Sequence, residues 1–402
     1  MYQPITTLTT ADANGVKRVL GAFETVKVTR SIEAAASSFD VSGMWPGTDA
    51  NSIVSSAPPG DGAIATPGAE CTIEHIVGGQ RATVLRGWID RPPITMDETE
   101  HSIEIAGKSF TGQLVECSAI GQGEWVGRRD KAIIGDIANA YGINVEFKVE
   151  KGEKIPRFVI ESGETAYSAI ERVAALRSLL VYDDEQGSLV IDRARDEFAA
   201  TALDVTSIKR INIEQDASRI FNRIVVRSQE PGSGDKPSRQ GTFAEAIDTD
   251  SFPWRPERVL IIDAESPLTE AQCKERADWE HATRFGQAMQ IVIAVAGWTT
   301  PEKGVHVWKP NTLIHYTDAV HGIDDVFLIS EVTLAYGQDT GHETTLRLQP
   351  PAAFEKLAPA KRVQREVAKV KNAGPGKFPL GFARSLAESY KEWLAAALAA
   401  TR

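Results

Sequence analysis

Short stretches with the composition of β-strands recur in two separate parts of this chain, and they constrain its fold more than any other feature. The first series includes CTIEHIV, RATVLRGWID and HSIEIAG, and the second includes AMQIVIAVAGW, DVFLISEVTLAYG and ETTLRLQ. Val, Ile, Leu and aromatic residues are frequent in β-strands, and polar or glycine-containing turns separate the stretches of the first series. The sequence therefore predicts two antiparallel sheets or barrels, far apart along the chain.

Between the two series the period changes to that of helices. Asp130 begins a stretch whose apolar residues fall on one helical face, and Gly142 is placed to end it. A second helical stretch, ETAYSAIERVAALRS, precedes LLVYDDEQGSLVID, which reads as two strands joined by a turn at Gly187. The expected fold class is α+β, mainly β: two similar antiparallel β-barrels, a small α/β domain and a helical C-terminal arm.

These patterns give expected domain boundaries. The first β-barrel takes 1–118, and the second takes 201–228 together with 304–351. The α/β domain takes 119–200 and also 229–303, which includes a helix inserted within the second series. The arm takes 352–402, where the apolar residues expected to share one helical face and to contact a protein partner are Tyr390, Trp393, Leu394 and Leu398.

The two series show a weak internal repeat. At a constant offset of 243 residues, Ile103 aligns with Leu346 and Ile105 with Leu348, with the same inward and outward parity. If the duplication is real, FETVKVTRSIE corresponds to RIFNRIVVRSQE, and a large insertion interrupts the second copy. Few identities support the alignment, so chance similarity is the competing interpretation.

Composition disfavours several classes of function. The chain of 402 residues has 55 acidic and 44 basic residues, a formal net charge of -11, and no basic stretch suited to binding phosphates. Cys71, Cys117 and Cys273 lie far apart without a CxxC pattern, which favours buried free thiols over disulfides or a metal. No apolar run approaches the roughly 18 residues of a membrane span. We expect no cofactor, no metal and no membrane anchor.

The usual catalytic motifs are absent from the sequence. It contains no GxSxG, HExxH or GxxxxGK[ST]. A glycosidase needs only two suitably spaced carboxylates, and five lie close together: Glu161, Glu164, Asp183, Asp184 and Glu185. Such residues more often cap helices and close turns, so we expect a protein that is not an enzyme.

Aromatic residues offer one further candidate surface. Trp279, Trp298 and Trp308 are grouped in the sequence and are suited to stacking on a sugar, although packing in a core or a subunit interface is the favoured interpretation. His281 lies on the same predicted helix as Trp279, where a hydrogen-bonded structural role is favoured over catalysis.

Several ordered motifs resemble those of the baseplate hub family of Mu-like contractile phages. They are VTRSIEAAASSFDVS, GWIDRPP, SIEIAGKSFTGQLVECSA, ERADWEHATRFGQAMQIVIAVAGW and WKPN, and together they extend from about Thr29 to Gln349. The chain departs from the family at Lys108, where arginine is usual. The plan is also similar to the N-terminal part of VgrG proteins of type VI secretion.

The resemblance implies a homotrimer in which two similar β-barrels per subunit form a ring of six. It implies a trimeric spike protein below the ring and the tail tube above it. Other baseplate proteins are further partners, and DNA passes through a channel without specific binding. The protein would then lie in the virion tail and, during assembly, in the host cytoplasm. The alternatives are a tail-associated lytic enzyme that acts on the cell wall, or a carbohydrate-binding β protein.

Overall fold

The expected mainly β, α+β class is confirmed. The computed structural model describes residues 4–11, 17–21, 23–44, 67–91, 94–96, 101–121, 123–152, 154–177, 179–194, 199, 202–228, 241–247, 257–263, 270–301 and 304–354. No helix within these ranges is long and apolar enough to cross a membrane. The arm residues Tyr390, Trp393, Leu394 and Leu398 lie outside the described residues.

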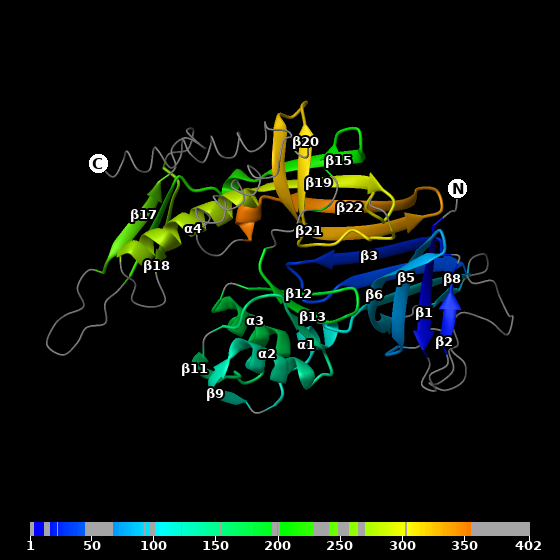
Figure 1. Cartoon of the computed structure of the whole chain (residues 1–402), viewed down its shortest axis with the longest axis horizontal. Coiled ribbons are helices and arrows are strands. Elements are labelled where there is room, and N and C mark those ends of the chain that lie inside the picture. The colour runs from blue at the N-terminus through cyan, green and yellow to red at the C-terminus, as the bar shows by residue number, and fades with distance from the viewer. Residues whose placement is uncertain are drawn as a thin grey trace.

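Strands from both ends of the chain form one continuous sheet of 14 strands, with the order β15-β19-β22-β21-β3-β4-β8-β6-β5-β1-β2 and with β7, β14 and β20 paired beside this path (Figure 1). The first half contains β1 (Ile5–Ala11), β2 (Lys17–Leu20), β3 (Thr25–Ser31), β4 (Ser38–Met44), β5 (Glu70–Val77), β6 (Gln80–Arg91), β7 (Ile94–Met96) and β8 (His101–Ser109). The second half contains β14 (Leu203–Asp204), β15 (Ile208–Gln215), β19 (Met289–Ala296), β20 (Leu313–Asp318), β21 (Ile323–Gly337) and β22 (Gly341–Gln349).

The two halves meet where β3 pairs antiparallel with the second part of β21, from Ser31 opposite Glu331 to Thr25 opposite Gly337. Figure 1 shows these strands side by side although they come from opposite ends of the chain. Val28 and Leu334, which face each other across this seam, are both 0% exposed. The two expected barrels therefore share a sheet and one apolar core within the described residues.

A repeated strand order relates the halves. The order β3-β4-β8-β6-β5 of the first half matches β15-β19-β22-β21-β20 of the second. A β-bulge interrupts β6 against β8 between Ile89 and Arg91, and another interrupts β21 against β22 between Ile329 and Glu331. Bulges are specific local features of a strand pair, so their matching positions fix the register of the repeat.

This register corrects the alignment expected from the sequence. At the bulges Gly107 lies opposite Ile89, and Leu348 lies opposite Ile329. Ile105 is thus the counterpart of Leu346, two residues from the expected Leu348. The strands were matched correctly, but the register was not, because a shift of two residues preserves the inward and outward parity that the sequence pattern reports.

One expected strand equivalence is wrong. The counterpart of β3 is β15, not RIFNRIVVRSQE. That segment forms β16 (Arg223–Arg227), which pairs with β17 (Phe243–Ile247) and β18 (Val259–Asp263) in a separate sheet. An alternating pattern indicates a half-buried strand, but it does not say which sheet the strand joins.

The separate sheet packs on the longest helix, α4 (Glu270–Ala288), through an apolar core that includes Val226 and Cys273. Helix α4 also contacts β19 and the short turns η1 (Ala217–Arg219) and η2 (Pro351–Ala353). The sequence grouped 229–303 with the α/β domain. In the structure the described part of that segment instead forms its own small unit with β16, and its last strand, β19, joins the large sheet.

The α/β domain has a core of its own below the large sheet (Figure 1). Its predicted helices are present as α2 (Asp130–Asn139) and α3 (Ala166–Ala175), and Gly142 and Gly187 both adopt the positive φ expected of them, 70° and 77°. The remaining elements are α1 (Gly112–Glu116), β9 (Glu124–Arg129), β10 (Val145–Phe147), β11 (Lys154–Val159), β12 (Leu180–Asp183) and β13 (Leu189–Asp192).

Candidate functional site at the junction of the sheet and the α/β domain

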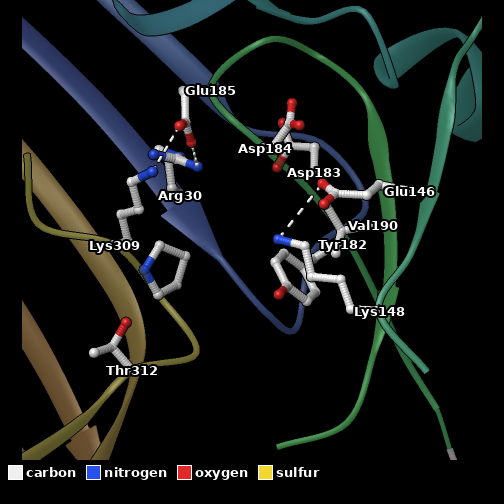
Figure 2. A pocket seen from close by; sticks show the side chains of 11 residues that line it. Arg30, Glu146, Lys148, Tyr182, Asp183, Asp184, Glu185, Val190, Lys309 and Thr312 are labelled. Atoms are coloured by element: carbon white, nitrogen blue, oxygen red, sulfur yellow. Dashed lines mark hydrogen bonds and ion pairs between the residues drawn. The ribbon is translucent and has the colours of Figure 1, made fainter. Parts of the chain in front are cut away.

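A buried arginine joins the large sheet to the α/β domain. Val26, Val28 and Arg30 alternate on the inward face of β3, and the Arg30 side chain is only 3% exposed. Its Nη2 atom lies 3.2 Å from Oε2 of Glu185, in the turn between β12 and β13. Nζ of Lys309, from the loop before β20, lies 2.7 Å from Oε1 of the same carboxylate (Figure 2). Glu185 thus connects three separate parts of the chain.

The positive charges of Arg30 and Lys309 keep Glu185 ionised. Burial raises its pKa, but the Arg30 guanidinium and the Lys309 ammonium outweigh burial and hold the pKa at about 2. The carboxylate is therefore ionised throughout the neutral range.

The neighbouring Asp183 ties the same turn to the loop between β3 and β4. It is 1% exposed and accepts hydrogen bonds from the Ser37 backbone N–H at 2.9 Å and the Ser37 hydroxyl at 2.8 Å. Burial raises the pKa of Asp183, while the nearby Arg30 and the hydrogen bonds from Ser109 and Ser37 counteract part of that rise. Arg30 therefore offsets the buried charge of Asp183 as well as pairing with Glu185.

Asn311 forms a second polar link at this junction. Its backbone has a φ of 59°, an uncommon conformation for a residue other than glycine. Its side-chain amide donates to Oη of Tyr182 at 3.2 Å and to the Arg193 carbonyl at 3.0 Å. An apolar cluster beside it contains Ile32, Tyr182, Val190, Ala194, Leu313 and Leu328, which come from both sides of the junction.

A cleft of about 210 Å³ opens at this junction. Figure 2 shows Arg30, Lys309 and Glu185 on one side of the cleft and Glu146 with Lys148 on the other. Nζ of Lys148 lies 3.5 Å from Oε2 of Glu146. The lining carries groups of both signs, and its three cations, Arg30, Lys309 and Lys148, already pair with Glu185 or Glu146. Such an arrangement of paired charges holds the α/β domain rigidly against the large sheet.

The carboxylates singled out in the sequence all have structural contacts. Asp184 closes its own turn by accepting from the backbone N–H groups of Gln186 at 2.9 Å and Ser188 at 2.8 Å. Glu164 pairs with Arg172 at 2.8 Å, and Glu161 lies 3.4 Å from the same arginine. Sequence reasoning found this density of acids but missed Arg30, whose signal was a lone charge at an inward position of an alternating strand.

The tryptophans do not form the stacking surface that was considered. Trp298 and Trp308 are 0% and 2% exposed and belong to the large apolar core. Trp279 lies apart on α4, with the Arg276 guanidinium 4.7 Å above its ring. His281, on the same helix, stacks on Phe285 with ring centroids 6.5 Å apart. The packing interpretation agrees with the structure for Trp298 and Trp308.

The thiols are free, as expected, but only two are buried. Cys71 and Cys273 are buried, and Cys117 is half-buried. Burial raises the pKa of the Cys71 thiol to about 12, so this thiol is not a reactive thiolate. In the described part of the chain, no three His, Cys, Asp or Glu side chains are grouped in a way that suits a metal ion.

Two histidines make a further contact between the halves of the sheet. The ring of His75, on β5, lies 5.0 Å from that of His342, on β22, and 4.9 Å from that of Trp298. His342 also lies 3.1 Å from the Thr6 hydroxyl of β1. Burial, together with the neighbouring His342, lowers the pKa of His75 to about 4, and burial lowers that of His342 to about 4. Both rings are therefore neutral at pH 7.

Mild acid should loosen this contact. A histidine with a folded pKa of about 4 and an unfolded value of 6.5 stabilises the fold fully above pH 6.5, and this contribution disappears as the pH falls toward 4. We expect His75 alone to reduce the free energy of unfolding by about 2 kcal/mol between pH 7 and pH 5. Urea unfolding at the two pH values measures the loss. The loss of unfolding free energy should be smaller in the H75F variant, and an unchanged loss in that variant would assign the acid sensitivity to other groups.

Comparison with known proteins shows that this chain is similar to phage baseplate proteins. Residues 111–193 match the family model described as the second domain of gp44-like baseplate hub proteins. Residues 269–357 match the fourth domain of the Mu phage baseplate assembly protein GpP. The curated baseplate hub protein gp44 of Escherichia phage Mu is 29% identical over 356 residues, which cover 84% of this chain and 86% of gp44.

Several solved structures share the fold of this chain. The 43 kDa tail protein of prophage MuSo2 from Shewanella oneidensis has a TM-score of 0.73 and 26% identity, covering 87% of this chain and 99% of that one. A tail protein of Neisseria meningitidis MC58 shares the fold, with a TM-score of 0.66, 20% identity, and coverage of 88% and 98%. A lidless PdpA–VgrG complex contains a chain with the same fold at a TM-score of 0.51 and 10% identity, covering 89% of this chain and 67% of that one.

The motifs, the two domain models and the matches over most of the chain agree with one another. The resemblance read from the sequence is confirmed: over most of its length the chain is similar to the baseplate hub proteins of Mu-like contractile-tailed phages.

Proposed function

We propose that this hub acts as a homotrimeric ring that joins the tail tube to a central spike and leaves a channel through which DNA passes. The observation that supports this most is the repeated five-strand order with its matching bulges. A chain that contains the same unit twice presents six similar units when three copies assemble. Such a ring can face a sixfold tube on one side and a threefold spike on the other.

The joint around Arg30 suits this role. A hub that transmits load between tube and spike must keep its parts in fixed relative positions, and the buried ion pair and Asn311 hold the α/β domain against the seam of the sheet. This is binding without turnover, and we propose that the protein is not an enzyme. A purified chain that degraded cell walls would favour the lytic alternative.

The net charge of -11 supports passage of DNA without binding, because acidic surfaces repel phosphates. On this proposal the protein lies in the virion tail, after assembly in the host cytoplasm. The spike, the tail tube and neighbouring baseplate proteins are its partners. A carbohydrate-binding protein would instead be a stable monomer with affinity for sugars.

Light scattering of the purified chain tests the ring. We expect a mass three times the 43.7 kDa of one chain at micromolar concentration, since a ring that anchors a tail should bury far more than the roughly 1,600 Å² of a standard interface. A monomer in neutral buffer would contradict the proposal.

The arm is the remaining part of the proposal. We place its apolar residues Tyr390, Trp393, Leu394 and Leu398 in contact with protein, either on the hub itself or on the spike. A chain ending at Phe354 is the right control in the mass measurement, because Ala353 contacts Gly286 of α4 and Phe354 packs on the cluster beside Asn311. A trimer formed by the shortened chain would show that the arm is not needed for the ring.

A further inference from the structure

Among the described strands, β15 has one neighbour where its counterpart β3 has two. β3 pairs with β4 along one edge and with β21 along the other. β15 pairs with β19 along the edge that corresponds to β4, and the described part of the chain places nothing along its other edge. Val26 and Val28 on β3 are 1% and 0% exposed, whereas Ile211 and Ile213 are only half-buried. The matched register makes these isoleucines the counterparts of the two valines.

Strand β7, in the first half, also lacks a described neighbour along one edge. β3 lies along the part of β21 that follows its bulge, from Glu331 to Gly337. In the first half, the residues after the corresponding bulge are Arg91 and then β7, which pairs with β8. Among the described residues no strand lies along the other edge of β7. The first half thus contains the position that β3 occupies on β21, but no strand that the structure describes in the same chain fills it.

We propose that β15 of one copy pairs antiparallel with β7 of a second copy and so repeats between chains the seam that β3 and β21 form within one chain. The register follows from the internal seam, where Val28 lies opposite Leu334, Lys27 opposite Ala335 and Val26 opposite Tyr336. Carried over to the other copy, Ile213 lies opposite Ile94, Asn212 opposite Thr95, and Ile211 opposite Met96.

This inference rests on the proposed trimer and names the strands that close it. Among the described residues each chain has one unpaired β15 edge and one unpaired β7 edge, so the contact is head-to-tail and pairs all of these β15 and β7 edges once the ring is closed. Three internal seams and three contacts between chains would then alternate around the ring. Pro92 and Pro93 precede β7 and have no N–H to donate, which confines the ladder to the neighbourhood of Ile94 to Met96.

Cysteine cross-linking tests the register. Asn212 is exposed, and directly opposite residues of antiparallel strands have Cα atoms about 4.5 to 5.5 Å apart, within the range of a disulfide. Two variants, N212C and T95C, are made in a C117S background that removes the half-buried thiol. Because each variant carries one engineered cysteine, a disulfide-linked heterodimer after mixing and oxidation can form only between chains. We expect the mixture to yield mainly this dimer, and a chain with both cysteines to yield covalent trimers.

Two controls accompany the experiment. A chain with K27C and A335C carries the internal counterpart of the same pair and should form its disulfide within one chain, which calibrates the chemistry. A mixture of N212C with V19C tests the other terminal strand of the sheet, because Val19 of β2 is 65% exposed and a simple end-to-end arrangement would pair β15 with β2.

Each outcome decides between the proposals. Cross-linking of N212C to T95C, with little to V19C, supports the contact between β15 and β7. A trimer by light scattering that cross-links through V19C, or through neither position, overturns this inference and leaves the ring intact. A monomer by light scattering overturns both the ring and the contact.

Discussion

Replacing Arg30 with methionine should reduce the free energy of unfolding by about 3 to 5 kcal/mol, the cost typical of breaking a buried ion pair from one side. The guanidinium is 3% exposed and pairs with Glu185 at 3.2 Å. Without it, Glu185 retains only the half-exposed Lys309, and the buried Asp183 loses the positive charge that offsets its burial. Urea denaturation of the purified variant measures the change.

A double variant separates this charge effect from packing. R30M combined with E185Q should be less destabilised than the sum of the two single changes, because the neutral amide that replaces the carboxylate no longer needs a cation. R81M is the matched control, since Arg81 pairs with Glu74 at 3.3 Å while it is 65% exposed, and its loss should cost less than about 1 kcal/mol. Similar losses for R30M and R81M would show that the joint contributes little to stability.

Replacing Gly107 with alanine should destabilise the first half of the sheet by about 3 kcal/mol or more. Gly107 lies on β8 between Phe39 and Ile89. A Cβ atom there would lie 2.1 Å from the Trp88 carbonyl oxygen and 2.7 Å from two atoms of the Phe39 ring. The carbonyl belongs to the backbone of β6, so a side-chain rotation cannot relieve the overlap.

Replacing Gly135 with alanine should instead increase the stability of the protein. Gly135 lies within α2, and the nearest atom to an added Cβ is Nδ2 of Asn139 at 4.0 Å. Alanine stabilises a helix interior by roughly 0.5 to 1 kcal/mol relative to glycine. Thermal unfolding of G107A and G135A, compared with the unchanged chain, tests both. A G107A protein as stable as the original would mean that β6 and β8 can separate without cost.

Local patterns in the sequence predicted most elements of the α/β domain. The helical periodicity around Ile133 and Ile170 and the turn at Gly187 give α2, α3 and the hairpin of β12 and β13. These elements depend on residues close together in the chain, where periodicity and turn chemistry are informative.

Contacts between distant segments were not predictable in the same way. The seam pairs Val28 with Leu334, and Arg30 pairs with Glu185, but alternation within a strand does not name the strand beside it. For the same reason β16 was assigned to the wrong sheet, and the repeat was aligned two residues out of register. The arm proposed to contact protein lies outside the described residues and stays a prediction.

The seam between β3 and β21 also has a mechanical consequence. Seven consecutive residue pairs join the halves in an antiparallel ladder, from Thr25 opposite Gly337 to Ser31 opposite Glu331. A pull directed along these strands loads all the backbone hydrogen bonds at once, whereas a pull across them opens the ladder one bond at a time. The halves should therefore resist sliding past each other far better than peeling apart, and a contracting tail that loads the hub along β3 would act on its strongest direction.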